Sequence, residues 1–160
     1  MLIALIGGIT TTDLVSAFPE GAYPRGSKTW VPDATYGSRC WRYVKNAEAA
    51  TAFAVGTVVM NRTATSATGE GLVAATSVAA HRVIGVAQHA IPAVSWGWVL
   101  CEGDGLVIAD TGGFTADTGL IPGDAVAGTA DNVGAATGAI FAIARATTLA
   151  TATGRCFIRC

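Results

Sequence analysis

The feature that most constrains the fold is the segment 83–105, in which two apolar runs flank a proline-containing connection. The first run ends at Ala87, Pro92 lies in the connection, and the second run, 96–102, leads into the turn Glu102-Gly-Asp-Gly105. Short apolar runs bounded by Gly, Pro and Asp are typical of strands joined in a hairpin. The segment therefore predicts a β-hairpin.

The chain from residue 39 onward continues in the same manner. Many short apolar runs with turn signals between them indicate a sandwich or a barrel. The candidate strands are 39–45, 56–62, 71–75, 82–88, 96–102, 105–109, 123–128, 139–145 and 155–159. The alanine-rich segment 46–54 is a helical competitor, long enough for two turns. We nevertheless expect an all-β fold, a small β-barrel or sandwich.

Residues 1–35 differ from the rest of the chain. They hold three of the five prolines and have few runs with strand periodicity. We predict an extended N-terminal arm, with a short helix near residues 12–15, followed by a β domain over 36–160. The apolar start, residues 1–8, carries no Lys or Arg before it and is too short to span a bilayer, so neither a signal peptide nor a membrane anchor is expected.

Two internal echoes suggest that the barrel is built from a repeat. Residues 53–60 resemble residues 120–127, and the pair 83–88 and 97–101 resembles the pair 140–145 and 154–158. Each echo has the form of strand, connection and strand. Chance similarity is the alternative, because Ala and Gly are common throughout the chain.

The composition favours a subunit of an assembly. Hydrophobic residues make up 51% of the chain, charged residues only 13%, and the mean hydropathy is +0.48. A surface with so few charges is poorly protected against association.

The charges are also segregated along the chain, although the net charge is only −1. Basic residues dominate from Arg25 to Arg62, and the stretch from Glu102 to Asp131 carries only acidic ones. Asp residues that serve turn geometry explain part of this pattern. The other interpretation is a basic N-terminal third that contacts an acidic protein surface. A nucleic-acid-binding domain would be basic overall, and the pI of about 6.0 argues against one.

Residues that carry catalysis or bind metals are sparse. His81 and His89 are the only side chains that titrate near neutrality, and Ser95, Asp104 and Asp110 would have to complete a triad without a nucleophile-elbow motif. The four cysteines lack zinc-site spacing and are expected to stay free in a reducing cytoplasm; they are Cys40, Cys101, Cys156 and Cys160. On one strand Cys156 and Cys160 would lie about 13 Å apart and would not bridge. We expect no catalytic residue, metal or cofactor.

Two aromatic pairs have the i, i+2 spacing that places both rings on one face of a strand. They are Trp41 with Tyr43 and Trp96 with Trp98. Three roles remain open for them: core residues, anchors at a subunit interface, or a platform on which sugars stack.

Several segments carry a family resemblance. The run Ile84 to Gly103, written IGVAQ-x-AIPA-x-x-WGWV-x-x-EG, resembles a segment of the small capsid decoration (cement) proteins of tailed bacteriophages. Further segments fit the same family in the same order: Tyr36 to Lys45, Ala54 to Val59, Pro122 to Val126 and Cys156 to Arg159. The resemblance covers most of residues 36–160.

The resemblance implies a non-enzymatic, β-tulip-like barrel that acts as a homotrimer. Such a protein binds the exterior of the virion capsid, is assembled in the host cytoplasm and clamps neighbouring subunits of the phage major capsid protein, with no nucleic-acid or membrane partner. We expect the arm to contact the capsid, and we expect seven residues at the capsid or subunit interface: Tyr36, Arg39, Trp41, Arg42, Tyr43, Trp96 and Trp98. The alternatives are a glycan-binding module that uses exposed Trp and Tyr residues, or an enzyme subunit that uses His81 or His89.

Overall fold

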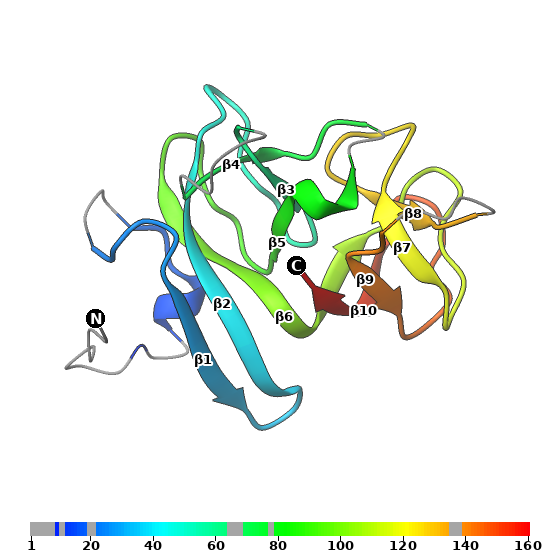
Figure 1. The fold of residues 1–160 in the computed structure, drawn as a ribbon, viewed down its shortest axis with the longest axis horizontal. Coiled ribbons are helices and arrows are strands. Elements are labelled where there is room, and N and C mark those ends of the chain that lie inside the picture. Colours follow the sequence, from blue (N-terminus) through cyan, green and yellow to red (C-terminus); the bar gives the residue numbers. More distant parts are fainter. Residues whose placement is uncertain (1–8, 10–11, 19–21, 64–68, 77–78, 135–138) are drawn as a thin grey trace.

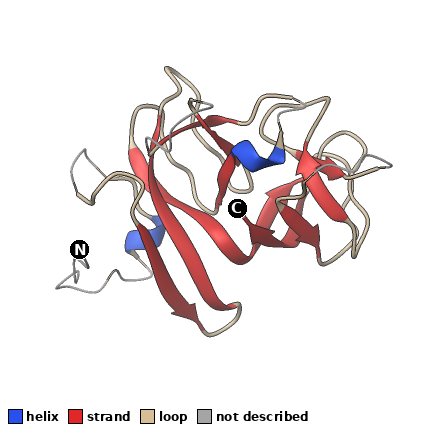
Figure 2. Ribbon diagram, in the orientation of Figure 1, coloured by secondary structure: helices blue, strands red, loops and turns tan. Residues whose placement is uncertain are grey.

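The computed structural model describes residues 9, 12–18, 22–63, 69–76, 79–134 and 139–160 (Figures 1 and 2). The all-β prediction is confirmed, because the strands of this part of the chain join one hydrogen-bonded sheet and its two helices are single 3-10 turns. The elements are η1 (Asp13–Val15), β1 (Lys28–Asp33), β2 (Gly37–Asn46), β3 (Val58–Asn61), β4 (Glu70–Val73), η2 (Ala80–Arg82), β5 (Val83–Ala87), β6 (Trp96–Ile108), β7 (Gly119–Pro122), β8 (Ala130–Asn132), β9 (Ala142–Ala144) and β10 (Thr153–Arg159).

The hairpin predicted over 83–105 is present. Strands β5 and β6 are antiparallel, with Val86 opposite Leu100 and Ala87 opposite Val99. The candidates 96–102 and 105–109 are one strand, because β6 continues through the glycine-containing stretch between them.

Part of the sheet closes on itself to form a first small barrel. Strand β2 pairs with β4 in parallel and with β6 in antiparallel fashion, and β3 and β5 complete the ring. A separate buried cluster fills this ring: Val44, Phe53, Val59, Ile84, Ala87, Ile91 and Val99. The predicted barrel is thus confirmed for this part of the chain.

A second ring of the same design shares β6 with the first. Strand β10 pairs with β6 and β9, β9 pairs with β7, and β7 pairs with β8. A parallel bridge between Ala109 and Ala130 joins β8 to the end of β6, as the parallel β2–β4 pairing joins the first ring. In Figure 1 the second ring, β7 to β10, lies to the right of the first.

The two barrels are repeats of one pattern of pairing. Three pairs in the first barrel have counterparts in the second: Val58–Val86 and Gly119–Ile143, Val86–Leu100 and Ile143–Phe157, and the bridges Phe53–Ile91 and Phe114–Thr148. The internal sequence similarity between 83–101 and 140–158 therefore corresponds to a structural repeat. The other echo is out of register, since residues 53–60 correspond to residues 114–121.

One predicted strand, 123–128, is absent, and the helical alternative considered for 46–54 is not realised; side-chain hydrogen bonds explain both. Segment 46–54 is not a helix, because the buried amide of Asn46 donates to the carbonyls of Thr51 and Ile91 and so fixes an irregular connection. Segment 123–128 is a turn, whose Ala125 and Val126 N–H groups donate to the carboxylate of Asp110.

The region assigned to an arm contributes to the sheet. Strand β1 lies within residues 1–35 and pairs with β2 along its whole length, so residue 36 falls in the turn of the β1–β2 hairpin. The short helix near residues 12–15 is present as η1. The prediction for residues 1–8 lies outside the described residues. None of the helices in the described part of the chain is long and apolar enough to span a membrane.

Candidate functional surface

The two aromatic pairs expected at an interface lie in the core. Trp41, Tyr43, Trp96 and Trp98 are between 0% and 2% exposed. The Tyr43 ring stacks on Trp96 with centroids 5.3 Å apart and lies 5.2 Å from the Trp98 ring. Their burial corrects the interface expectation and excludes Trp96 and Trp98 as a sugar platform, since a ring without exposed area offers nothing to a partner.

The N-terminal segment covers this aromatic cluster. Phe18 forms an antiparallel bridge with Trp96, and the Tyr23 ring packs edge-on 5.1 Å from Trp98 and 5.2 Å from Tyr43. Leu14 is 2% exposed in the same cluster. Burial, together with the nearby Tyr23, raises the pKa of Tyr43 to about 12. The described part of the predicted arm thus packs on its own chain.

Tyr36 is exposed and Arg39 is half-buried in the β1–β2 hairpin. This hairpin projects from the first barrel (Figure 1). The Arg39 guanidinium stacks 5.0 Å from the Tyr36 ring and 4.9 Å from the Trp41 ring. It also forms an ion pair of 2.6 Å with Asp33. Burial of Asp33 opposes ionisation, but the N–H groups of Thr35 and Tyr36 and the charge of Arg39 outweigh it and lower the pKa of Asp33. These contacts hold the hairpin end in one conformation.

The hairpin end is tied to the second barrel through charged groups. Arg155 of β10 lies over the Tyr36 ring at 5.0 Å and pairs with Asp104 at 3.2 Å. Arg145 pairs with the same carboxylate at 3.2 Å and lies 5.2 Å from the Phe157 ring. The exposed surface of β6, β9 and β10 is therefore a mixture of arginine and apolar side chains.

The sequence reasoning missed Trp30, whose side chain is 57% exposed on β1. It shares the exposed face of this strand with Lys28 and Pro32, and the half-buried Arg42 lies opposite Lys28 on β2. The available signal was the run of β-branched and aromatic residues over 29–31, which favours a strand. Pro32 is unfavourable in a strand, and the segment lies within residues 1–35, which were assigned to an arm, so no strand was predicted here.

The histidines and aspartates considered for catalysis have other surroundings in the structure. His89 is buried and its Nδ1 lies 3.1 Å from the carbonyl of Ala90; burial lowers its pKa, partly offset by the backbone carbonyls of Ala90 and Trp98. Asp104 is paired with arginines, and Asp110 accepts hydrogen bonds from backbone N–H groups. His81 is exposed on η2.

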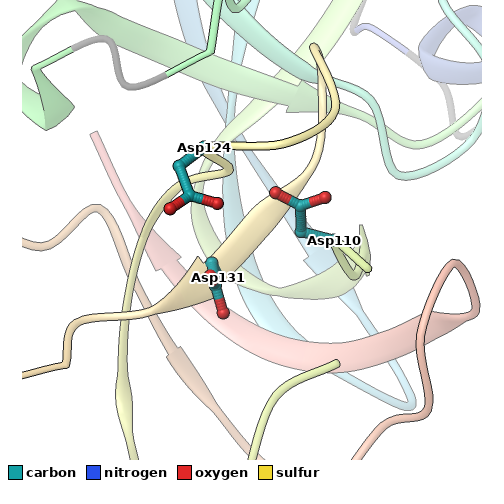
Figure 3. Close-up of side chains that lie close together, drawn as sticks. All are labelled: Asp110, Asp124 and Asp131. Carbon is teal, nitrogen blue, oxygen red and sulfur yellow. The ribbon is translucent and has the colours of Figure 1, made fainter. Parts of the chain in front are cut away.

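Three carboxylates meet near the β7–β8 turn, which the sequence did not predict. Oxygen atoms of Asp110, Asp124 and Asp131 lie within 4.8 Å of one another (Figure 3). Burial opposes ionisation of Asp110, yet the N–H groups of Ala125, Thr111, Val126 and Asp124 outweigh it and lower its pKa. These donors give Asp110 a structural role in holding the turn.

The cysteines are free thiols. Burial is the main cause that raises the pKa of Cys101, Cys156 and Cys160 to about 12 each. Cys156 belongs to the core of the second barrel, and the Cys160 N–H donates to the carbonyl of Cys101 at 2.8 Å.

No family model and no curated protein matches the chain. Among solved structures, the fold is similar to the crystal structure of the head fiber gp8.5 N base in bacteriophage phi29. The TM-score is 0.53 at 15% identity, and the match covers 74% of this chain and 92% of that one. At this identity the similarity concerns the fold: this chain shares its β architecture with a structural protein of a phage head.

Proposed function

We propose that this protein is a non-enzymatic structural protein of a tailed-phage virion that binds the outside of the capsid. The observation that carries the proposal is the fold shared with a phage head fiber base over most of both chains. The segments that resemble capsid decoration proteins point the same way.

The finer part of the proposal is that the protein acts as a homotrimer at three-fold positions of the shell. Packaged DNA loads the shell outward, and a clamp across neighbouring capsid subunits adds contact area that must be lost before they separate. Each contact is made three times by a trimer on a three-fold axis, so weak single contacts give high avidity. A combined interface of roughly 2,000–5,000 Å² would suit such a permanent complex.

The β1–β2 hairpin is the proposed contact with the major capsid protein. It projects from the body, and its end is held rigid by the Asp33–Arg39 pair and the stacked Tyr36 ring. Trp30 supplies an exposed aromatic anchor, and Lys28 and Arg42 supply positive charge beside it. Aromatic residues and arginine are the types that most often dominate binding energy at interfaces.

The proposal is tested by binding purified protein to shells of the phage that encodes it, with sedimentation as the measurement. The full chain should co-sediment with shells, and Trp30→Ala should weaken binding about tenfold or more. The control is Leu149→Ala, which removes another exposed apolar side chain far along the sequence from the hairpin. A wild-type chain that leaves shells unbound contradicts the capsid role, and equal binding by the Trp30→Ala variant contradicts the role of the hairpin.

A further inference from the structure

Apolar side chains are exposed to solvent on the outer side of the second barrel. Leu106, Ile140 and Ile143 are 37%, 44% and 40% exposed, and Phe157 is half-buried. Phe157 lies directly opposite Ile143 across the β9–β10 pair, so both point to the same side of the sheet. We call these four residues the open face. Three of them line a groove of about 570 Å³: Ile140, Ile143 and Phe157.

The same positions of the first barrel are covered. The β5–β6 pair Val86–Leu100 corresponds to Ile143–Phe157, and both Val86 and Leu100 are 0% exposed. They belong to the cluster that also contains Leu14 of the N-terminal segment and Val107 of the second barrel. One chain therefore covers this side of its first barrel with its own segments and leaves the equivalent side of its second barrel uncovered.

The residues around the open face are predominantly basic. The side chains of Arg145 and Arg155 are 50% and 48% exposed, and Arg159 is exposed at the edge of the groove. Asp104 and Glu102 offset part of this charge. A partner that fits would carry an apolar side chain for the groove and a carboxylate beside it.

The β7–β8 turn of this protein has that chemistry. Val126 is 40% exposed, and Asp124, two residues earlier, is exposed and negatively charged. Asp124 also lies close to the carboxylates of Asp110 and Asp131, so a cation from another molecule would relieve local repulsion (Figure 3). The turn is held by hydrogen bonds from Ala125 and Val126 to Asp110 and is presented as a rigid unit.

We propose that the open face binds the β7–β8 turn of a second copy of this chain, with Val126 in the groove and Asp124 beside Arg145 and Arg159. Two different patches meet in such a contact, so repetition closes a ring when the rotation between copies allows it. The inference rests on the proposed function, because it specifies how the homotrimer would be built.

The experiment measures the oligomeric state of the full chain by sedimentation velocity over a range of concentrations. Wild-type protein should be an oligomer, and Ile143→Asp should shift it to monomer by weakening association about a hundredfold. Leu149→Asp is the matched control, since Leu149 is 80% exposed and does not line the groove. Both positions are exposed, so both variants should fold, with the circular dichroism spectrum of the wild-type protein.

A charge swap tests the pairing of the two patches. Arg159→Glu and Asp124→Arg should each weaken association about tenfold, and the double variant should recover most of the loss. A wild-type monomer, or an oligomer indifferent to Ile143→Asp, overturns the proposal. Single losses without recovery in the double variant overturn the pairing with the β7–β8 turn.

Shell binding separates this inference from the proposed function. An oligomer that Ile143→Asp disrupts, but that does not bind shells, supports the inference and contradicts the capsid role. A wild-type monomer whose shell binding is lost in Ile143→Asp assigns the open face to the capsid protein and overturns the second-copy proposal.

Discussion

Gly97 and Gly154 lie at the same position in the two barrels, and at both a side chain would collide with a residue of an isolated antiparallel bridge. A methyl group on Gly97 would lie 2.8 Å from Ile91 Cδ1, and one on Gly154 would meet Thr148 Oγ1 and the Phe114 ring. Ile91 and Thr148 are equivalent bridge residues, paired with Phe53 and Phe114. The close approach of the bridge residues to the strand is what requires glycine here.

Gly154→Ala should therefore destabilise the protein by about 2–3 kcal/mol, and Gly97→Ala by about 1–2 kcal/mol, because the buried neighbours must shift to admit a methyl group. Urea unfolding followed by tryptophan fluorescence measures both. Gly112→Ala is the control, because a methyl group there would lie 3.7 Å from Asp131 Oδ1, an ordinary contact distance. Its effect should stay within about 0.5 kcal/mol. Equal stability of all three variants would refute the steric argument.

Val94 and Thr151 form a second equivalent pair, with φ of 55° and 57° in the turns before β6 and β10. A β-branched residue is strained in this left-handed region, and glycine is not. Val94→Gly and Thr151→Gly should each raise the free energy of unfolding by up to about 1 kcal/mol. Ala150→Gly, at a neighbouring position without positive φ, should lower it. Thermal unfolding measures these changes in stability. A loss of stability in both Val94→Gly and Thr151→Gly would show that the two turns are not strained.

Leu14 and Val15 are neighbours in η1 with opposite environments, 2% and 56% exposed. Leu14→Ala should cost about 2–4 kcal/mol, since it leaves a cavity in the aromatic cluster. Val15→Ala should change stability by less than about 0.5 kcal/mol. The measurement is again denaturant unfolding. Equal effects of the two variants would mean that the N-terminal segment does not dock on the first barrel.

Asp110 links stability to pH. Its pKa is lowered in the folded protein, so its ionised form adds stability that is complete above the unfolded pKa of about 4 and is lost as the pH falls through the folded pKa. Asp110→Asn should cost about 1–3 kcal/mol at pH 7, and the difference from wild type should shrink below pH 4. Asp124→Asn, at an exposed carboxylate nearby, is the control. A difference that is constant from pH 7 to pH 3 would contradict the assigned role.

The strands of the first barrel follow from local sequence more readily than those of the second. Segment 82–102 contains two apolar runs separated by a connection with Pro92, and the pairing of β5 with β6 follows from this pattern. Strands β7 and β8 are short and contain Pro122, Asp131 and Asn132, which are unfavourable in strands. They form because pairing with β9 and the bridge at Ala130 supply the stability that their composition does not.

The sequence by itself determined that the chain is all-β, that 83–105 is a hairpin, and that each aromatic pair shares one face of its strand. Those properties depend on residues close together in the chain. Only the tertiary structure decided which faces are covered: Leu100 is buried, while Phe157 at the equivalent position is half-buried. The physical reason is that burial depends on which distant segment packs on a face, and strand periodicity carries no information about that segment.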